Sequence, residues 1–170
     1  IEEADDDDSL FLINLNTRPE LVSREFTPIR SDATRQVLQR TTASRLGATN
    51  LMAGMEAAAE VIKQHKVTNP HILYLGDGVA TDGSKEVFEP VRAVPREATF
   101  VGIGVGKKVD SLFLQEAADR TGGMFTTINP DEDIDWRVFD LLAALNTPRL
   151  TKLRVELQDA VGRPIKATAY

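Results

Sequence analysis

The sequence predicts an α/β domain with a parallel sheet, because short apolar segments of β-forming residues alternate with segments of helical periodicity. Turns rich in glycine, asparagine and proline separate these segments. With 170 residues, 42% of them hydrophobic, the chain is long enough for one domain with a sizeable core, or for a domain and a fragment of a second. Strands that alternate with helices place helices on both faces of the sheet.

The first elements are predicted to form a β-hairpin followed by a helix. Residues 9–16 are rich in β-forming side chains, and residues 20–26 alternate weakly, as a short edge strand does. Ser31 or Asp32 then caps a helix that ends near residue 44. Further strands are predicted at residues 71–75, 98–104 and 124–128, and further helices at residues 51–66, 84–93, 110–120 and 133–145, the first of them capped by Thr49 or Asn50 and the third opened by Asp110.

Composition excludes several classes of function. The net charge is −6 and the basic residues are scattered, so no basic stripe tracks phosphates, and nucleic acid is not an expected partner. No apolar run approaches the roughly 18 residues that span a membrane. The chain has no cysteine, which excludes disulfides and thiolate chemistry. Residues 1–8 hold six acidic side chains and are expected to form a solvated turn, with a calcium loop as the weaker alternative.

The stretch from His71 to Gly83 contains the first candidate site residue. Its apolar run reads as a strand that is buried on both faces and breaks at Gly76-Asp77-Gly78. Ligands bind at the carboxyl edge of open α/β sheets, so Asp77 is a candidate ligand-binding residue. The alternative is that Asp77 only makes an Asx-turn with the backbone of its own loop.

Two other patterns offer weaker signals. The run Gly102-Ile103-Gly104-Val105-Gly106 matches neither the dinucleotide fingerprint nor the phosphate loop, so a glycine-rich strand exit is the better interpretation. His65 and His71 are the only histidines, and both occupy positions typical of a protein surface. No pair of residues has the character of a nucleophile and its base, and we expect no enzyme activity.

Several stretches together resemble the von Willebrand factor type A domain. They are residues 46–51 (LGATNL), 76–78 (GDG), 100–104 (FVGIG) and 113–123, from Phe113-Leu114 to Thr121-Gly122-Gly123. Asn14 to Thr17 and a β-rich tail at residues 150–157 are similar to the bacterial and inter-α-trypsin inhibitor heavy-chain proteins that carry a VIT domain upstream. The resemblance covers about residues 9–157, and it divides the chain into a von Willebrand A-like domain at residues 1–147 and the start of a β-rich domain at residues 148–170.

This resemblance implies a Rossmann-like three-layer sandwich with a mostly parallel sheet and a metal-ion-dependent adhesion site at its carboxyl edge. In such a site Mg²⁺ or another divalent cation takes oxygen ligands from the domain and from an acidic residue of a protein partner. Carried over to this chain, Thr49 is the loop ligand and Asp77 is the ligand after the fourth strand of the family. The family's Asp-x-Ser-x-Ser motif is absent from the chain, and Gly76 stands where the family has Thr, so cation binding by this chain alone is expected to be weak or absent.

The resemblance also implies that the first strand of the sheet is missing. In the family's strand order 3-2-1-4-5-6 this strand lies between residues 9–16 and residues 71–75. We therefore expect an N-terminal fragment or a second copy of the chain to supply it, because rows of unpaired buried backbone groups would cost more than a domain's stability. The implied function is protein binding in adhesion or scaffolding, outside the cytoplasm or at the cell surface. The alternatives are a Rossmann-like nucleotide-binding enzyme and a structural spacer with a degenerate metal site.

Overall fold

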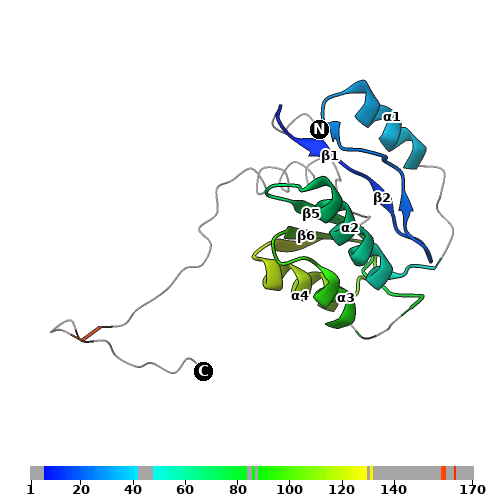
Figure 1. The fold of residues 1–170 in the computed structure, drawn as a ribbon. Helices are drawn as coiled ribbons and strands as arrows, with labels where there is room; N and C mark the ends of the chain where they lie inside the picture. The colour runs from blue at the N-terminus through cyan, green and yellow to red at the C-terminus, as the bar shows by residue number, and fades with distance from the viewer. Residues whose placement is uncertain are drawn as a thin grey trace.

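The computed structural model describes residues 6–41, 48–83, 86, 88–129, 131, 158–159 and 163 (Figure 1). Within these ranges the strands are β1 (Ser9–Leu10), β2 (Ile13–Asn14), β3 (Glu20–Leu21), β4 (Thr27–Pro28), β5 (His71–Gly76), β6 (Thr99–Val105) and β7 (Met124–Ile128). The helices are α1 (Asp32–Thr41), α2 (Leu51–His65), α3 (Phe88–Ala93) and α4 (Ser111–Thr121). The helix predicted at residues 133–145 lies outside the described residues, as does nearly all of the region from 148 to 170.

Strands β5, β6 and β7 form a parallel sheet in that order. In the register, Leu73 lies opposite Val101, and Val101 lies opposite Met124. Helices connect these strands and flank the sheet, as parallel crossovers require. The predicted α/β class with a parallel sheet and flanking helices is therefore confirmed.

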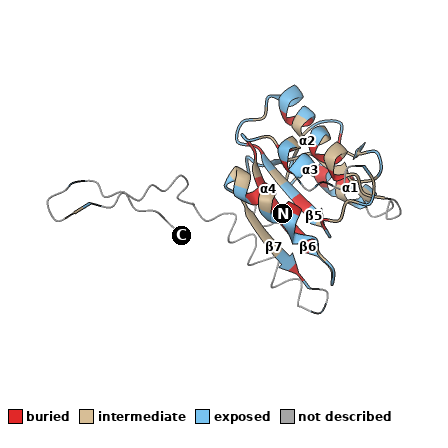
Figure 2. Cartoon of the chain, turned by 90° about the horizontal axis from the view of Figure 1, so that it is seen from below, coloured by how far each residue is buried: buried red, intermediate tan, exposed pale blue. Residues whose placement is uncertain are grey.

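The main core lies between this sheet and the layer of helices α2, α3 and α4 (Figure 2). The aromatic rings of Tyr74, Phe100 and Phe113 contact one another at its centre, with centroids 5.8 to 6.3 Å apart. Leu114 of α4 is fully buried against them. Gly102 of β6 admits this helix, because a Cβ on Gly102 would lie 3.1 Å from the Cβ of Leu114. Close packing of α4 on the strand thus accounts for Gly102.

The predicted hairpin is present, but each of its strands is interrupted. Strand β2 pairs with β3 and β1 pairs with β4, both antiparallel. Between them the Leu12 carbonyl oxygen accepts from the N–H groups of both Val22 and Ser23, at 3.0 and 3.2 Å. Two residues thus oppose one, as in a β-bulge, and the ladder is broken. The prediction of one continuous strand over residues 9–16 was wrong for this reason.

The prediction that the 71–75 strand is buried on both faces was also wrong. Tyr74 is buried against the helices, but the side chains of Leu73 and Leu75 are 58% and 67% exposed. Helices α2 to α4 cover only the Tyr74 side of β5, and β6 is the one strand among the described residues that pairs with it. Helix α3 is described from Phe88, and Ser84, where its start is predicted, lies outside the described residues.

Candidate cation site at the carboxyl edge of the sheet

Asp77 follows the last residue of β5 and opens the loop at the carboxyl edge of the sheet. Its exposed side chain accepts a hydrogen bond through Oδ1 from the Val79 N–H, at 3.0 Å, which is an Asx-turn. Its carbonyl oxygen accepts from the N–H of Asp110, the N-cap of α4, at 2.8 Å. The turn that we weighed as the alternative for Asp77 is therefore present, and among the described residues Oδ2 of the carboxylate has no hydrogen bond.

Tyr74 holds the same loop from inside the core. Its hydroxyl oxygen accepts from the Gly78 N–H at 3.2 Å. Burial raises the pKa of Tyr74 to about 12; the Gly78 bond opposes this rise, and the nearby Asp77 carboxylate adds to it. Gly78 has φ +74°, and a Cβ there would lie 2.5 Å from the Asp110 carbonyl oxygen. The backbone that follows Asp77 is therefore fixed by a buried hydroxyl and by a glycine that no other residue replaces without strain.

Thr49 lies in the loop before α2, and this loop is bound to the one that Asp77 opens. The Thr49 carbonyl oxygen accepts from the N–H groups of Thr81 and Asp82, at 3.0 and 3.1 Å. In return the Thr49 N–H donates to the Thr81 Oγ1 at 2.6 Å. Asn50 caps α2, since its Oδ1 accepts from the Ala53 N–H at 3.0 Å. The structure thus brings the predicted ligands Thr49 and Asp77 into one pair of joined loops.

Tyr74 and Thr81 were not predicted as site residues from the sequence, although these two residues hold the loops in place. Thr81 precedes the turn Asp82-Gly83, and a Cβ on Gly83 would lie 2.7 Å from the Asn50 side chain. That Thr-Asp-Gly turn was a signal for a loop contact. Tyr74 gave no local signal, because an aromatic residue in an apolar strand is ordinarily only core.

The donor atoms match a hard cation in kind but are few. Thr49 offers a hydroxyl oxygen and Asp77 a carboxylate oxygen, which are the ligands that Mg²⁺ prefers, and Mg²⁺ usually keeps several waters. Within the described part of the chain no group of three or more His, Cys, Asp or Glu side chains could hold a metal ion. The two residues fit a cation site that is completed from elsewhere, and their assignment as ligands stays a prediction.

A pocket lies at the same edge of the sheet, beyond the ends of β6 and β7. Its volume is about 350 Å³, and it is lined by Gly106, Lys107, Val109, Thr127, Asn129 and Asp131. Lys107 Nζ lies 3.5 Å from the Asp131 Oδ2, so a carboxylate stands beside the one amine of this lining. Gly104 faces Val109, whose Cγ1 would lie 2.5 Å from an added Cβ. These contacts favour packing over nucleotide binding as the reason for the glycines.

Comparison with known proteins identifies the family. A sequence model described as the von Willebrand factor type A domain matches residues 2–127. The chain belongs to the von Willebrand factor type A domain family. The domains of this family are in general interaction modules without enzyme activity.

Solved structures agree on the fold. A structure titled as von Willebrand factor type A from Catenulispora acidiphila superposes with a TM-score of 0.67 at 13% sequence identity. The alignment covers 84% of this chain but only 34% of that protein, so this chain spans about a third of its length. An uncharacterised membrane-spanning protein from Vibrio fischeri is 21% identical over 82% of this chain and 76% of that one. Its TM-score of 0.39 is too low to indicate a shared fold. No curated protein matches the chain.

Among the described helices of this von Willebrand A domain, none combines the length and apolar character needed to cross a membrane.

Proposed function

We propose that this von Willebrand A domain binds a protein partner by capturing an acidic residue through a divalent cation, Mg²⁺ or a similar hard ion. Thr49 and Asp77 would supply two of the cation's oxygen ligands. The observation that carries the proposal is the double hydrogen bond from Thr81 and Asp82 to the Thr49 carbonyl oxygen, because it joins the two candidate ligand loops. Adhesion or scaffolding at a cell surface, in a protein that also carries a VIT domain, is the setting we propose for it.

The residues of the chain would act by presenting oxygens rather than by moving protons. Asp77 would contribute the negative charge, Thr49 a neutral hydroxyl, and Tyr74 the rigid support of the Asp77 loop through its bond to Gly78. A bound cation supplies a positive centre to which a partner's carboxylate coordinates. Recognition would then require a partner that presents an accessible Asp or Glu.

We further propose that another polypeptide segment pairs with the outer edge of β5. The Thr99 N–H bonds to the Pro70 carbonyl oxygen. Because a parallel ladder uses the backbone groups of alternate residues, the N–H and C=O groups of Ile72 and Tyr74 point to β6. The N–H and C=O groups of Leu73 and Leu75 therefore point to the other edge, where no described strand pairs with them. An N-terminal fragment or a second copy of the chain would supply the strand.

The position of the hairpin supports a gap of this kind. The Asn50 N–H bonds to the Asn16 carbonyl oxygen at 3.2 Å, just after β2, and Asn50 adjoins the loop that contacts Thr81 after β5. The segments that follow β2 and β5 thus both bond to the loop of Thr49 and Asn50, although the two strands share no ladder. Figure 1 shows β1 and β2 as a group separate from β5 and β6.

Thermal unfolding with and without Mg²⁺ tests the cation proposal. Mg²⁺ at ten times its dissociation constant should stabilise the fold by about 1.4 kcal/mol, a melting shift of a few degrees. Asp77→Asn should abolish the shift, since Asn keeps the acceptor of the Asx-turn but removes the charge. Asp119→Asn, an equal charge change at an exposed site on α4, is the control and should leave the shift intact.

Other responses in this assay would contradict the proposal. A shift with a nucleotide and none with Mg²⁺ would favour the nucleotide-binding alternative. No shift with either would favour a structural spacer with a degenerate site.

The strand proposal is tested on the same folded sample by intact mass under denaturing conditions, combined with amide hydrogen exchange. We expect a second polypeptide, or a dimer in the native state, together with slow exchange at the amides of Leu73 and Leu75. A monomer of one species in which these two amides exchange far faster than that of Tyr74 would refute it.

A further inference from the structure

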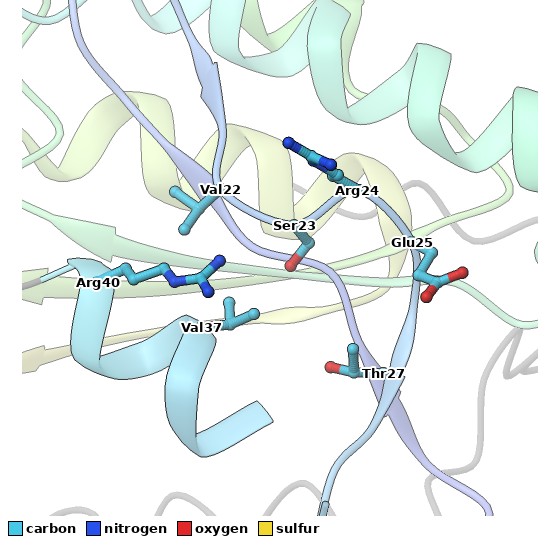
Figure 3. Close-up of a pocket in the computed structure, with 7 residues that line it drawn as sticks. All are labelled: Val22, Ser23, Arg24, Glu25, Thr27, Val37 and Arg40. Atoms are coloured by element: carbon cyan, nitrogen blue, oxygen red, sulfur yellow. The ribbon is translucent and has the colours of Figure 1, made fainter. Parts of the chain in front are cut away.

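A cavity lined by none of the candidate cation-site residues lies between the β3–β4 segment and α1 (Figure 3). Its volume is about 350 Å³, at the lower end of the range of small-ligand sites. The lining residues are Val22, Ser23, Arg24, Glu25, Thr27, Val37 and Arg40. The cavity thus combines aliphatic walls with cationic side chains in a chain whose net charge is −6.

A buried hydroxyl lies at the floor of the cavity. Ser23 is only 2% exposed, and its Oγ accepts from the Leu12 N–H at 3.0 Å. The hydroxyl hydrogen has no acceptor among the described residues and remains available to donate. Figure 3 shows the Ser23 oxygen directed into the space beside Val37. A buried donor without an acceptor is uncommon, so the cavity favours a ligand that accepts a hydrogen bond.

Two arginines at this cavity have no anionic partner within the described structure. Among the described residues Arg30 pairs with Asp6 at 2.9 Å and Arg35 with Asp32 at 2.7 Å, whereas no ion pair involves Arg24 or Arg40. In Figure 3 the guanidinium of Arg40 points toward Ser23, while that of Arg24 lies on the upper rim and points away.

Glu25 is the one acidic residue of the lining, and Figure 3 places it on the far side from Arg40. Arg40 also lies in the last turn of α1, where a cation is favourable in any case. That placement accounts for the charge, but it does not account for the neighbouring buried hydroxyl of Ser23.

We propose that this cavity binds the carboxylate of a glutamate side chain from a protein partner. The Arg40 guanidinium and the Ser23 hydroxyl would donate to the carboxylate oxygens, Arg24 would approach from the rim, and the methylene groups of the glutamate would lie against Val22 and Val37. Arginine offers a planar donor pair that matches a carboxylate. The cavity needs no cation, so it acts independently of Thr49 and Asp77 and extends the interaction surface of the domain.

The test is a titration of the isotope-labelled chain with the capped peptide acetyl-Gly-Glu-Gly-amide, followed by NMR. We expect saturable shifts of the Ser23 and Arg40 amides, unchanged in the presence of a chelator. The glutamine analogue of the peptide should not produce them. Arg40→Gln should weaken binding about tenfold or more, as expected for a lost charge-assisted pair. Arg35→Gln, on the same helix but already paired with Asp32, is the matched control and should change the affinity less than twofold.

Each other outcome overturns the proposal. Absence of saturable shifts, equal binding of the glutamine peptide, or equal losses in the Arg40 and Arg35 variants would leave only a nonspecific charge effect. If free glutarate binds as tightly as the peptide, the site is one for a small carboxylate and not for a protein partner. Binding that the chelator abolishes would assign the response to the cation site instead.

Discussion

Replacement of Tyr74 by phenylalanine tests whether the core hydroxyl holds the Asp77 loop. The change removes the acceptor of the Gly78 N–H, a bond of 3.2 Å, and Gly78 is buried. A buried donor left without a partner costs about 1–3 kcal/mol, so we expect the free energy of unfolding to fall by this amount at neutral pH. The ring itself keeps its contacts with Phe100 and Phe113.

The effect of Tyr74→Phe should depend on pH in a defined window. Below pH 10 the tyrosine is protonated in both folded and unfolded states, and its stabilising contribution is fully present. Because burial raises the pKa of Tyr74 from 10.0 to about 12, the unfolded chain loses this proton first as the pH rises. Each pH unit between these two pKa values lowers the free energy of unfolding by about 1.4 kcal/mol, or about 3 kcal/mol in total. The variant has no such loss at this position, so the gap between the two proteins should close or reverse by pH 12.

Urea unfolding followed by circular dichroism at pH 8 and pH 11.5 measures this gap. The control is Phe113→Leu, which alters a ring in contact with Tyr74 but introduces no change in ionisable groups. Its cost relative to the unmodified chain should be the same at both pH values. If the difference between the unmodified chain and Tyr74→Phe is also constant, the hydroxyl is not buried as the structure describes and the reasoning fails.

Three further substitutions test the loops of the candidate site by urea unfolding. Gly78→Ala should lower the free energy of unfolding by roughly 1–2 kcal/mol more than Gly122→Ala does, because the added Cβ is overpacked. Both glycines have positive φ, but only at Gly78 does the Cβ meet another group. Equal losses in the two variants would contradict this. Asn50→Ala should cost about 1 kcal/mol through loss of the α2 cap, and Asn50→Ser should recover most of it. Thr81→Val should cost about 1 kcal/mol and weaken any Mg²⁺ response, since the Thr49 N–H loses its acceptor, whereas Thr81→Ser should preserve both.

Patterns of a few adjacent residues were enough to predict the strands and helix caps of the parallel sheet and its helices. The 124–128 strand was placed at its observed bounds, and Asn50 and Asp110 cap α2 and α4 as predicted. These features depend on a few adjacent residues: an oxygen-bearing side chain bonds to an N–H of the first turn, and a β-rich run ends at a turn. They could be identified without knowledge of the tertiary structure.

Features that depend on distant contacts could not be predicted in this way. The 9–16 strand is interrupted where the Leu12 carbonyl oxygen accepts two hydrogen bonds, from the N–H groups of Val22 and Ser23 in the opposite strand. The exposure of Leu73 and Leu75 depends on which elements cover β5, whereas an apolar run alone predicts burial. The site residues were likewise recognised from a family motif, and the hydrogen bonds that position them are set by Thr81 and Tyr74.

Gly76, the residue before Asp77, shows how the core residue Tyr74 and the Asp77 loop depend on each other. The resemblance to the family places a threonine there, and its replacement by Gly76 was one reason to expect weak cation binding. In the structure a Cβ on Gly76 would lie 2.7 Å from the Tyr74 hydroxyl oxygen, so a side chain at position 76 requires the Tyr74 ring to move. A hydroxyl is therefore still present beside Asp77, but it bonds to the Gly78 backbone rather than to the carboxylate. Because this bond fixes the loop and leaves the carboxylate to its own Asx-turn, Gly76→Thr should displace Tyr74 and destabilise the fold rather than restore a family-type site.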